Sequence, residues 1–513
     1  MQEILSGSTM QQCDRSTMEY FGVISPVLME RAALKIAEYI IHTADREKDR
    51  ILAVCGSGNN GGDGIAAARL LCLAGYHAEI YFAGNREHAS TECGRQLSIA
   101  EKYGIPIHTE YPPGRWTVLL DSLFGIGLSR PVSGRYAELI RRLNDSKARK
   151  IAVDIPSGIH ADTGQVMGCA FRADATVTMG FYKMGQLLYP GATCCGRLIR
   201  AEIGIDHRSL LGHPPDAWSM EKNDLVRMPE RRNDSNKGSC GRVLLAAGSR
   251  NMAGAAILAA RAAYAAGCGL VRILTPECNR IPLQTAVPGA ILTVYDEEGC
   301  ESLDFQELCG WADAAAIGPG LGQSEASFHL LKGLLNEVRR RSAQKQGGSG
   351  LPCVIDADGL NLIAAHTELR PLLRGCILTP HMGEMSRLTG RRITELKASP
   401  VEAARSFAKD TGAAVVMKDA RTVSVTEDGR CFINCSGNHG MAVGGSGDVL
   451  TGLLTGILAQ DAGSEELVPL AVYIHGLAGD AAAREKGPYS MQAEDLINGI
   501  GIILKKVYFH ESI

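Results

Sequence analysis

Two glycine-rich loops, each containing an aspartate, lie far apart in this chain. The first is Gly58 to Gly64, which includes Asp63, and the second is Gly444 to Asp448. Each loop opens directly onto a helix-forming stretch. Backbone N–H groups at a helix N-terminus bind anions, and glycine allows the backbone to approach a phosphate closely. Because an aspartate repels phosphate, Asp63 and Asp448 are better suited to act as a base or to bind a hydroxyl group. The pattern predicts two phosphate-handling active sites on one polypeptide.

The elements around the first loop predict a parallel sheet. Short apolar runs alternate with helical patterns such as residues 28–37, and alternation of this kind is typical of a sheet with helices on both faces. The apolar runs are residues 51–55, 78–82, 117–120 and 150–153. Three of them lead into polar residues, which are Asn59-Asn60, Asp121-Ser122 and Asp154 to Gly158. Open α/β sheets bind ligands at the carboxyl ends of their strands, so we expect these three ends to form one site.

A second alternation of strands and helices begins after a polar, turn-rich segment. The segment between Gly204 and Gly238 contains His213-Pro214-Pro215 and Pro229 to Ser235, which indicates a domain boundary. The strands expected after it are residues 242–249, 270–274, 314–317, 353–355, 376–378 and 414–417. Gln346 to Gly350 is rich in glycine, but no helix follows it, so we interpret it as a surface loop.

Composition limits the class of protein. A chain of 513 residues is long enough for two large domains, and 45% hydrophobic with 21% charged residues is typical of a globular protein. A net charge of −3 without a long basic run argues against nucleic acid as a partner. The sixteen cysteines form no Cys-x-x-Cys pair, which favours a reducing compartment. The most apolar stretch is interrupted by Arg261, which excludes it as a membrane span. We expect a cytoplasmic enzyme that forms a homo-oligomer and has no membrane partner.

The first loop admits two interpretations. Gly56 to Gly61 fits the dinucleotide fingerprint G-x-G-x-x-G, so a dehydrogenase is one possibility. That fingerprint expects an acid at the end of the next strand, whereas Glu79 lies inside the strand. The longer string Asn59 to Gly64 is more specific. Together with the strings Met29 to Ala32, Asp121 to Gly125 and Val153 to Gly158, it closely resembles the NAD(P)HX epimerase family.

The resemblance implies a Rossmann-like three-layer αβα domain over residues 1–216, which handles hydrated nicotinamide nucleotides. It implies K+ bound by Asn60, Asp121 and Ser157, and a catalytic role at the reacting ring for Asp154. The positions implied to bind substrate are Asn59, Asn60, Gly61, Gly62, Asp63, Gly125, Ile126, Gly127, Leu128, Ser129, Arg130, Pro131 and Asp154. Inversion of the hydroxyl-bearing carbon beside the ring nitrogen requires a proton relay rather than a redox cofactor, and a strand-end carboxylate can supply one. The alternative is that Asp63 and Asp154 only cap the following turns.

The second loop resembles a different fold. The chain contains no G-x-x-x-x-G-K-[ST] motif, which leaves a P-loop nucleotidase unsupported. Gly444 to Asp448, followed by Leu450 and Gly452, resembles the terminal signature of the ribokinase-like fold. In that fold the glycine loop binds the transferring phosphoryl group and the aspartate deprotonates the acceptor hydroxyl. Further strings resemble the ADP/ATP-dependent NAD(P)HX dehydratase family: Gly254 to Leu258, Gly318 to Gly322, Asp356 to Asn361, Thr379 to Met385, Lys418 to Thr422 and Gly437 to Ala442.

This second resemblance implies a ribokinase-like αβα domain over residues 217–513, with Asp448 as the catalytic base. The positions implied to bind the hydrate are Ala255, Gly322, His381 and Asp448. The positions implied to bind the nucleotide are Lys418, Asp419, Ala420, Arg421, Thr422, Gly444, Gly445, Ser446 and Gly447. A turn histidine can also serve only to satisfy the backbone, which is the alternative for His381. Two positions, Asn236 and Val443, depart from the residues usual in that family.

The combined prediction is an α/β protein of two domains that repairs nicotinamide nucleotides. The first domain would interconvert the R and S forms of NADHX and NADPHX. The second would phosphorylate the hydroxyl of the S form and release phosphate, with ADP as the donor and Mg2+ accompanying it. The fusion of the two domains, which is typical of bacterial and archaeal members, implies ADP. Two alternatives remain open: a small-molecule kinase fused to a nucleotide-binding regulatory domain, and a first domain that is a non-catalytic scaffold.

Overall fold

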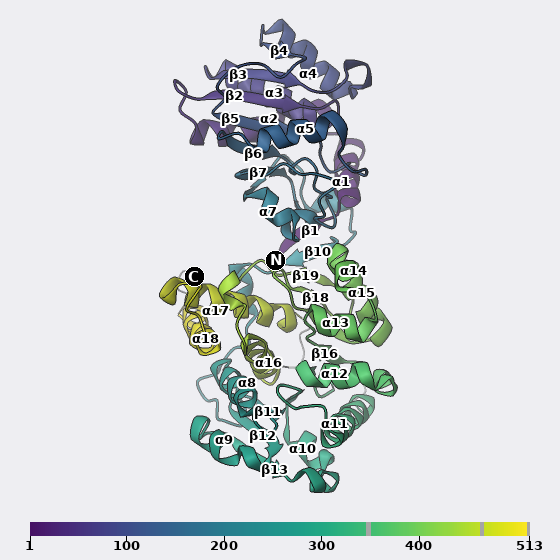
Figure 1. The fold of residues 1–513 in the computed structure, drawn as a ribbon, viewed down its shortest axis with the longest axis vertical. Coiled ribbons are helices and arrows are strands. Elements are labelled where there is room, and N and C mark those ends of the chain that lie inside the picture. Colours follow the sequence, from purple (N-terminus) through teal and green to yellow (C-terminus); the bar gives the residue numbers. More distant parts are fainter. Residues whose placement is uncertain (345–349, 462–465, 510–513) are drawn as a thin grey trace. The chain divides into compact units, whose positions relative to one another are not determined.

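The computed structural model describes residues 1–344, 350–461 and 466–509 and divides the chain into two compact units. One unit comprises Glu3–Ala217, and the other comprises Met1–Gln2 with Trp218–Ile513 (Figure 1). Of the glycine-rich segment interpreted as a surface loop, residues 346–349 lie outside the described residues.

The first unit is built on a seven-stranded sheet in which every neighbouring pair is parallel. In spatial order its strands are β4 (Ile107–His108), β3 (His77–Phe82), β2 (Arg50–Cys55), β5 (Val118–Ser122), β6 (Arg149–Val153), β7 (Ala175–Met179) and β9 (Arg197–Ala201). Two short strands, β1 (Gln2–Leu5) and β8 (Tyr182–Lys183), pair in parallel. The expected strands all lie within this framework, because their apolar runs are long enough to be buried on both faces.

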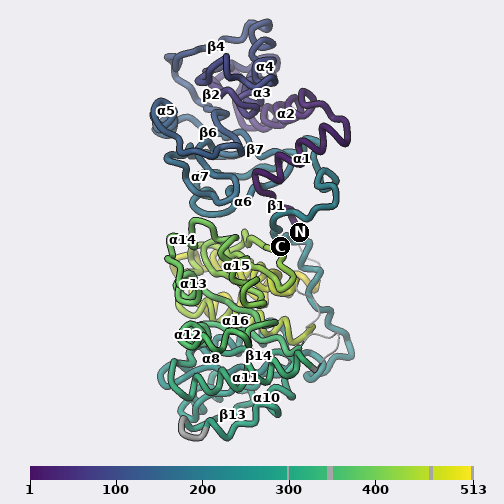
Figure 2. The backbone as a smooth tube through the Cα atoms, turned by 90° about the vertical axis from the view of Figure 1, so that its right-hand side faces the viewer, coloured from purple at the N-terminus to yellow at the C-terminus, as the bar shows by residue number. Residues whose placement is uncertain are grey.

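Helices cover both faces of this sheet (Figure 2). The helices are α1 (Gly7–Glu19), α2 (Ser25–Thr43), α3 (Asn59–Leu73), α4 (Thr91–Lys102), α5 (Gly134–Asn144), α6 (Met184–Leu187) and α7 (Gly191–Cys195). Alternate residues of β2 point to opposite cores: Ile51 and Ala53 pack with α2 and α3, whereas Leu52 and Val54 pack with α5. The result is the predicted three-layer αβα arrangement, in which α3 begins directly at the first glycine-rich loop.

The second unit has a larger sheet that is parallel from β13 to β17, antiparallel from β17 through β18 to β19, and parallel again between β19 and β10. Its strands, in spatial order, are β13 (Ile291–Tyr295), β12 (Leu270–Pro276), β11 (Arg242–Ala246), β14 (Ala314–Ile317), β15 (Cys353–Ile355), β16 (Cys376–Leu378), β17 (Ala414–Met417), β18 (Val423–Val425), β19 (Cys431–Ile433) and β10 (Ala217–Ser219).

Two groups of helices flank this sheet. Four helices share the main apolar core with the strands: α8 (Ala253–Ala265), α16 (Ser446–Leu458), α17 (Leu467–Lys486) and α18 (Ala493–Tyr508). The remaining helices are α9 (Arg280–Ala286), α10 (Phe305–Trp311), α11 (Glu325–Gln344), α12 (Ala357–Ala365), α13 (Met382–Thr389), α14 (Ile393–Ala398) and α15 (Pro400–Thr411). In Figure 1, α11, α12, α13 and α15 lie across the sheet from α8 and α16. Both domains are therefore α/β, as predicted.

Small residues let α16 approach α8 closely. A Cβ atom on Gly452 would lie 2.0 Å from the carbonyl oxygen of Ala259, and one on Gly456 would lie 2.7 Å from that of Ala263. Neither position can accept a side chain without separating the helices. Because the second glycine-rich loop leads into α16, this contact fixes the place of the loop.

Within the described residues no helix is both long and apolar enough to cross a membrane. All sixteen cysteines lie in the described part of the chain, and all are free thiols.

Candidate active sites

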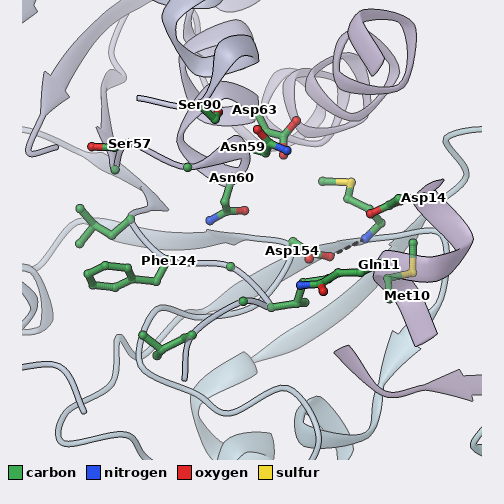
Figure 3. Close-up of a pocket in the computed structure, with 18 of the residues that line it drawn as sticks. Met10, Gln11, Asp14, Ser57, Asn59, Asn60, Asp63, Ser90, Phe124 and Asp154 are labelled. Carbon is green, nitrogen blue, oxygen red and sulfur yellow. Dashed lines mark hydrogen bonds between the residues drawn. The ribbon is translucent and has the colours of Figure 1, made fainter. Parts of the chain in front are cut away.

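A cavity of about 840 Å³ lies in the first unit, at the carboxyl ends of β2, β5 and β6 (Figure 3). Its walls come from α1, α2, the first glycine-rich loop, the segment 123–133 and the residues that follow β6 and β7. Pockets for small molecules and cofactors typically measure about 300–1,000 Å³, so a nucleotide-sized ligand fits this cavity. The cavity lies where open parallel sheets usually bind ligands.

Most residues assigned to the first site from the sequence line this cavity. They are Asn59, Asn60, Asp63, Gly125, Ile126, Gly127, Leu128, Ser129, Arg130, Pro131 and Asp154. Gly61 and Gly62, which were also assigned to the substrate, are not among the residues that line the cavity. A Cβ atom on Gly61 would stand 2.0 Å from the carbonyl oxygen of Gly56, and one on Gly62 would stand 2.8 Å from the Met29 side chain. These two glycines therefore allow close packing of α3 against its neighbours.

Asp154 is held in the cavity wall by an ion pair and by its backbone. Its φ of 63° is left-handed, a conformation that costs a non-glycine residue about 1–3 kcal/mol. The Nζ atom of Lys183 lies 2.5 Å from Oδ1 of Asp154, and the lysine side chain is fully buried. The side-chain amide of Gln186 donates to the Asp154 carbonyl over 2.5 Å. The surrounding structure thus stabilises a strained residue and its charge together.

Two more carboxyl groups face this ion pair. Burial raises the pKa of Asp63 well above its usual value, and the charges of Asp154 and Asp14 raise it further. Burial also raises the pKa of Asp14 to about 7, with a further upward contribution from Asp154 and an opposing one from Lys183. Figure 3 shows Asp14, Asp63 and Asp154 around the same space. The cavity therefore combines one ion-paired carboxylate with two carboxyl groups of raised pKa, an arrangement suited to proton transfer.

Two of the three residues expected to bind K+, Asp121 and Ser157, are hydrogen-bonded to each other, and the third, Asn60, lines the cavity and lies against Gly125. Asp121 accepts hydrogen bonds from Ser157 through the backbone N–H over 2.8 Å and through the hydroxyl over 2.7 Å. Both polar atoms of the Asn60 side chain are buried without a hydrogen-bond partner among the described residues. A buried amide without a partner costs about 1–3 kcal/mol, so a ligand for its oxygen would be stabilising. The oxygen donors of an amide, a carboxylate and a hydroxyl suit a hard cation.

In the second unit, the glycine-rich loop forms the entry to α16. Gly445 has a φ of 89°, and a Cβ atom there would meet the Leu258 side chain at 2.5 Å. Ser446 begins α16, and Asp448 lies in the first turn of that helix. The loop therefore presents backbone N–H groups at a helix N-terminus, as expected for an anion site. The imidazole of His475 is buried behind the loop and is hydrogen-bonded to the backbone of Ser446, and burial lowers its pKa to about 4.

A network of buried charge lies beside the loop. Lys418 Nζ lies 2.7 Å from Oδ1 of Asp356, and the Thr451 hydroxyl donates to Oδ2 of Asp356 over 2.7 Å. A Cβ atom built on Gly447 would stand 3.4 Å from Lys418 Nζ, which brings the lysine next to the loop. Lys418 follows β17 directly, and Asp356 follows β15, so the pair is positioned by the ends of two parallel strands that lie on either side of β16.

Asp448 faces this network. Burial raises its pKa to about 6, with the negative charges of Asp356 and Asp358 adding to the effect and Lys418 opposing it. Its carboxylate has no hydrogen-bond or ion-pair partner among the described residues. An unpartnered carboxylate whose pKa lies close to neutrality can accept a proton from a nearby hydroxyl.

The other residues assigned to the second site gather around the same strand ends. His381 caps α13 through Nδ1, which accepts from the Gly383 N–H over 2.9 Å, and an isolated bridge pairs His381 with Lys418. Gly322 donates its N–H to Asp358 over 2.9 Å. Ala255 lies at the start of α8, where a Cβ atom on Gly320 would stand 2.9 Å from its side chain. His381 therefore caps α13 through Nδ1 and also lies beside Lys418, while its Nε2 atom is 3.3 Å from Oε1 of Glu384 on the same helix.

The segment assigned to the nucleotide is the loop that follows β17. Asp419 and Ala420 are exposed, and Asp419 forms an ion pair of 3.3 Å with Lys397. Arg421 donates to the Cys435 carbonyl over 2.7 Å, and the Thr422 hydroxyl donates to the Asp419 carbonyl over 3.4 Å. Of this segment, Lys418 is the member that stands beside the glycine loop.

Comparisons with known proteins match both units. The family described as YjeF-related protein N-terminus matches residues 25–185, and the family described as NAD(P)H-hydrate dehydratase matches residues 243–501. A bifunctional NAD(P)H-hydrate repair enzyme from Thermofilum pendens is 38% identical over 507 residues, which cover 96% of this chain and 94% of that protein. The chain belongs to the bifunctional NAD(P)H-hydrate repair enzyme family.

Two further likenesses agree with this assignment. A bifunctional NAD(P)H-hydrate repair enzyme from Moorella thermoacetica is 34% identical and covers 98% of this chain and 97% of its own. A solved ribokinase-like superfamily protein from Enterococcus faecalis superimposes with a TM-score of 0.50 at 29% identity, covering 57% of this chain and 96% of its own. The likeness to this solved structure confirms the ribokinase-like fold that was predicted for the second unit.

In this member of the NAD(P)H-hydrate repair enzyme family, several residues of the two sites had been given no role on the basis of the sequence. Lys183 and Asp14 in the first site, and Thr451 and His475 in the second, belong to no glycine-rich loop. Asp356 opens a string that resembles the dehydratase family, but it was given no role. One signal was available for Lys183, which is an isolated cation in the otherwise uncharged run Gly180 to Gly185. A buried lysine in such a run needs a partner, so it points to a carboxylate elsewhere.

Proposed function

We propose that this chain epimerises the R and S forms of NADHX and NADPHX and dehydrates the S form to NADH or NADPH at the expense of ADP, giving AMP and phosphate. The observation that carries the proposal is Asp448, which stands unpartnered in the first turn of α16, beside Lys418 and the glycine-rich loop. The whole-length likeness to bifunctional repair enzymes supports the presence of both activities in one chain.

For dehydration, we assign to Asp448 the removal of the proton from the ring hydroxyl. Water is a poor leaving group, so the hydroxyl oxygen attacks the terminal phosphorus of ADP and AMP leaves. Phosphate then leaves the ring carbon in place of water, and the adjacent carbon loses a proton as the double bond of the reduced ring forms. The N–H groups of the loop Gly444 to Gly447 bind the transferring phosphoryl group, and Lys418 offsets its charge. Mg2+ would accompany the nucleotide. The charges of the neighbouring Asp356 and Asp358 raise the pKa of Asp448, and a divalent cation would neutralise part of this negative charge.

For epimerisation, we assign the reacting ring to the side of the cavity that holds Asp154. The loop at Asn59 and the segment Gly125 to Pro131 would hold the rest of the nucleotide. The strained backbone of Asp154 and its ion pair with Lys183 support a functional role, since left-handed non-glycine residues cluster at active sites. K+ held by Asn60, Asp121 and Ser157 would fix the loop that contacts the substrate.

We further assign epimerisation to residues 1–216 and dehydration to residues 217–513, which the division of contacts after Ala217 supports. We place the enzyme in the cytoplasm, where its sixteen free cysteines stay reduced. We expect it to be a homo-oligomer.

One assay tests the proposal. A mixture of (R)- and (S)-NADHX is incubated with ADP, with ATP or with neither nucleotide, and the recovery of reduced nicotinamide absorbance is followed. Full recovery with ADP is expected. Recovery of only the S share would exclude epimerase activity, and recovery with ATP alone would exclude ADP as the donor. A stable phosphoester in place of NADH and phosphate would identify a kinase instead.

The K+ assignment predicts that Asn60→Leu abolishes the response to K+. In the wild type, exchange of NaCl for KCl should raise the melting temperature of the first domain, by about 5 °C if K+ is present at 100 times its Kd. The variant should show no such rise, and its epimerase rate in KCl should fall at least about tenfold. Calorimetry and epimerase assays in both salts measure the two effects. Gln12→Leu, which changes an exposed amide on α1 outside the cavity lining, is the control; an undiminished K+ response in Asn60→Leu would exclude Asn60 as a ligand.

A further inference from the structure

Helix α1 forms one wall of the cavity in the first unit. Met10, Gln11, Asp14 and Met18 line the cavity at helical spacing, so one face of the helix is turned toward the ligand space. Figure 3 shows Met10, Gln11 and Asp14 on this helix, on the same side of the cavity as the Asp154 ion pair. Helix α1 contains neither a glycine-rich loop nor any of the strings that resemble the two families.

The other faces of α1 are fixed to the protein. Ser6 caps the helix by accepting from the Thr9 N–H over 3.1 Å, and Thr17 is hydrogen-bonded to Ser209 through their hydroxyls over 2.8 Å. Cys13 is buried in the core that lies between the sheet and α2. Asp14 is therefore presented by a rigid element, which is what a group that must meet a reacting atom requires.

Asp14 differs from Asp154 in its partners. Asp154 has the Lys183 ammonium at 2.5 Å. Asp14 has no hydrogen bond or ion pair with any described residue, although it lies half-buried in the cavity wall. The charges of Asp154 and Lys183 shift the pKa of Asp14 in opposite directions. The charge of Asp14 in turn raises the pKa of Asp63 on α3 and of Cys13 on its own helix. Burial raises the pKa of Asp14 to about 7, so its carboxyl is protonated below that pH.

Inversion at the hydroxyl-bearing carbon needs two proton-transfer groups. The base takes the proton of the hydroxyl group, the carbon–oxygen bond becomes a carbonyl, and the carbon–nitrogen bond breaks with its electron pair passing to the ring nitrogen. The acid gives that nitrogen a proton. Rotation of the open aldehyde presents its other face, and the same transfers in reverse close the ring with the opposite configuration. Both groups end in their starting states, and no oxidant or other reactant is consumed.

We propose that Asp14 is the general acid of this relay and Asp154 its base, so that α1 supplies a catalytic residue to the first site. The inference rests on the proposed epimerase activity and names a second group within it. Two carboxyl groups in contrasting environments, one ion-paired and one without a cation of its own, are the usual arrangement for an acid and a base in one site.

The test compares Asp14→Asn with Glu19→Gln in the full-length protein. Both changes remove one carboxyl group from α1, but Glu19 is exposed and lies outside the cavity lining. Pure (R)-NADHX is supplied without nucleotide, and the appearance of the S form is followed by chromatography with the non-enzymatic rate subtracted. Asp14→Asn should lower the kcat of epimerisation by at least about 100-fold, because general acid catalysis contributes roughly 10²–10⁴-fold. Its KM should stay within about threefold of the wild type, as expected for loss of an acid.

A second measurement does not depend on the variant. In the wild type, kcat/KM for epimerisation should fall as pH rises through about 7, because Asp14 loses the proton it must donate. Asp14→Asn should lack this alkaline fall. Glu19→Gln should retain both the rate and the pH profile, and ADP-dependent dehydration of (S)-NADHX should be unchanged in both variants.

The outcomes separate this inference from the proposed function. If the wild type does not epimerise NADHX, the proposed function fails. If the wild type does epimerise it and Asp14→Asn retains kcat within threefold, only the role of Asp14 fails. A rise in KM at unchanged kcat would make Asp14 a substrate-positioning residue and would overturn the proposal.

Discussion

Asp448→Asn should reduce dehydration of the S hydrate by about 10³-fold or more and leave epimerisation unchanged. A general base typically contributes 10²–10⁴-fold, and an asparagine in the same place cannot accept the hydroxyl proton. Asp448 is free of hydrogen bonds and ion pairs with the described residues, so the substitution breaks no existing contact. Folding should therefore be maintained, and the loss should appear in kcat.

The measurement is ADP-dependent recovery of NADH from (S)-NADHX, together with conversion of R to S in the same preparation. Glu402→Gln, an exposed change on α15 of the same unit, is the control and should retain both activities. If both activities fell together in folded Asp448→Asn, the assignment of two separate sites would be wrong.

The same residue predicts a pH dependence. Because burial and neighbouring carboxylates raise the pKa of Asp448 to about 6, the base is ionised above that pH and protonated below it. The kcat/KM of dehydration should therefore decline as pH falls through about 6. A dehydration rate independent of pH between 5 and 7 in the wild type would contradict Asp448 as the base.

The second large effect is expected for Asp154→Asn, which should lower epimerisation by at least about 10²-fold and leave dehydration unchanged. Asparagine tolerates left-handed backbone geometry, so the strained turn should persist. The substitution also leaves the fully buried Lys183 without its counter-ion, and breaking a buried pair in this way costs about 3–5 kcal/mol.

A double variant separates the chemical loss from the structural one. Asp154→Asn with Lys183→Met removes both charges and should recover much of the lost thermal stability, since replacement of a whole buried pair is often close to neutral. It should remain inactive as an epimerase. Epimerase activity near the wild-type level in either stable variant would show that Asp154 takes no part in the reaction.

The fold could be predicted from the sequence in most respects. The strands at 51–55 and 314–317 were evident because a parallel strand buried on both faces is a continuous apolar run. The strand expected over 242–249 was also found, but it ends at Ala246. The two glycine-rich loops were evident from their composition, and they contain positions such as Gly61 and Gly445 where close approach of neighbouring atoms or a left-handed backbone leaves no room for a side chain.

The groups that surround the two acids were not predictable in the same way. Lys183 pairs with Asp154 across 29 residues, and Asp356 pairs with Lys418 across 62. Such pairs form because parallel strands place distant segments at one edge of a sheet, and nothing in the local sequence records which segments meet. The electrostatic environment of an acid is likewise set by burial and by neighbours, so the raised pKa of Asp14 and of Asp448 follows from packing alone.

The amino-acid sequence by itself determined the two α/β domains, the two glycine-rich loops with their acids, and the family. These depend on local periodicity and on backbone requirements that each segment carries alone. The tertiary structure decided that Asp154 is strained and ion-paired, that α1 brings Asp14 into the same cavity, and that Asp448 lies beside an Asp356–Lys418 network. These depend on which strand ends lie side by side, and only the packed sheet sets that.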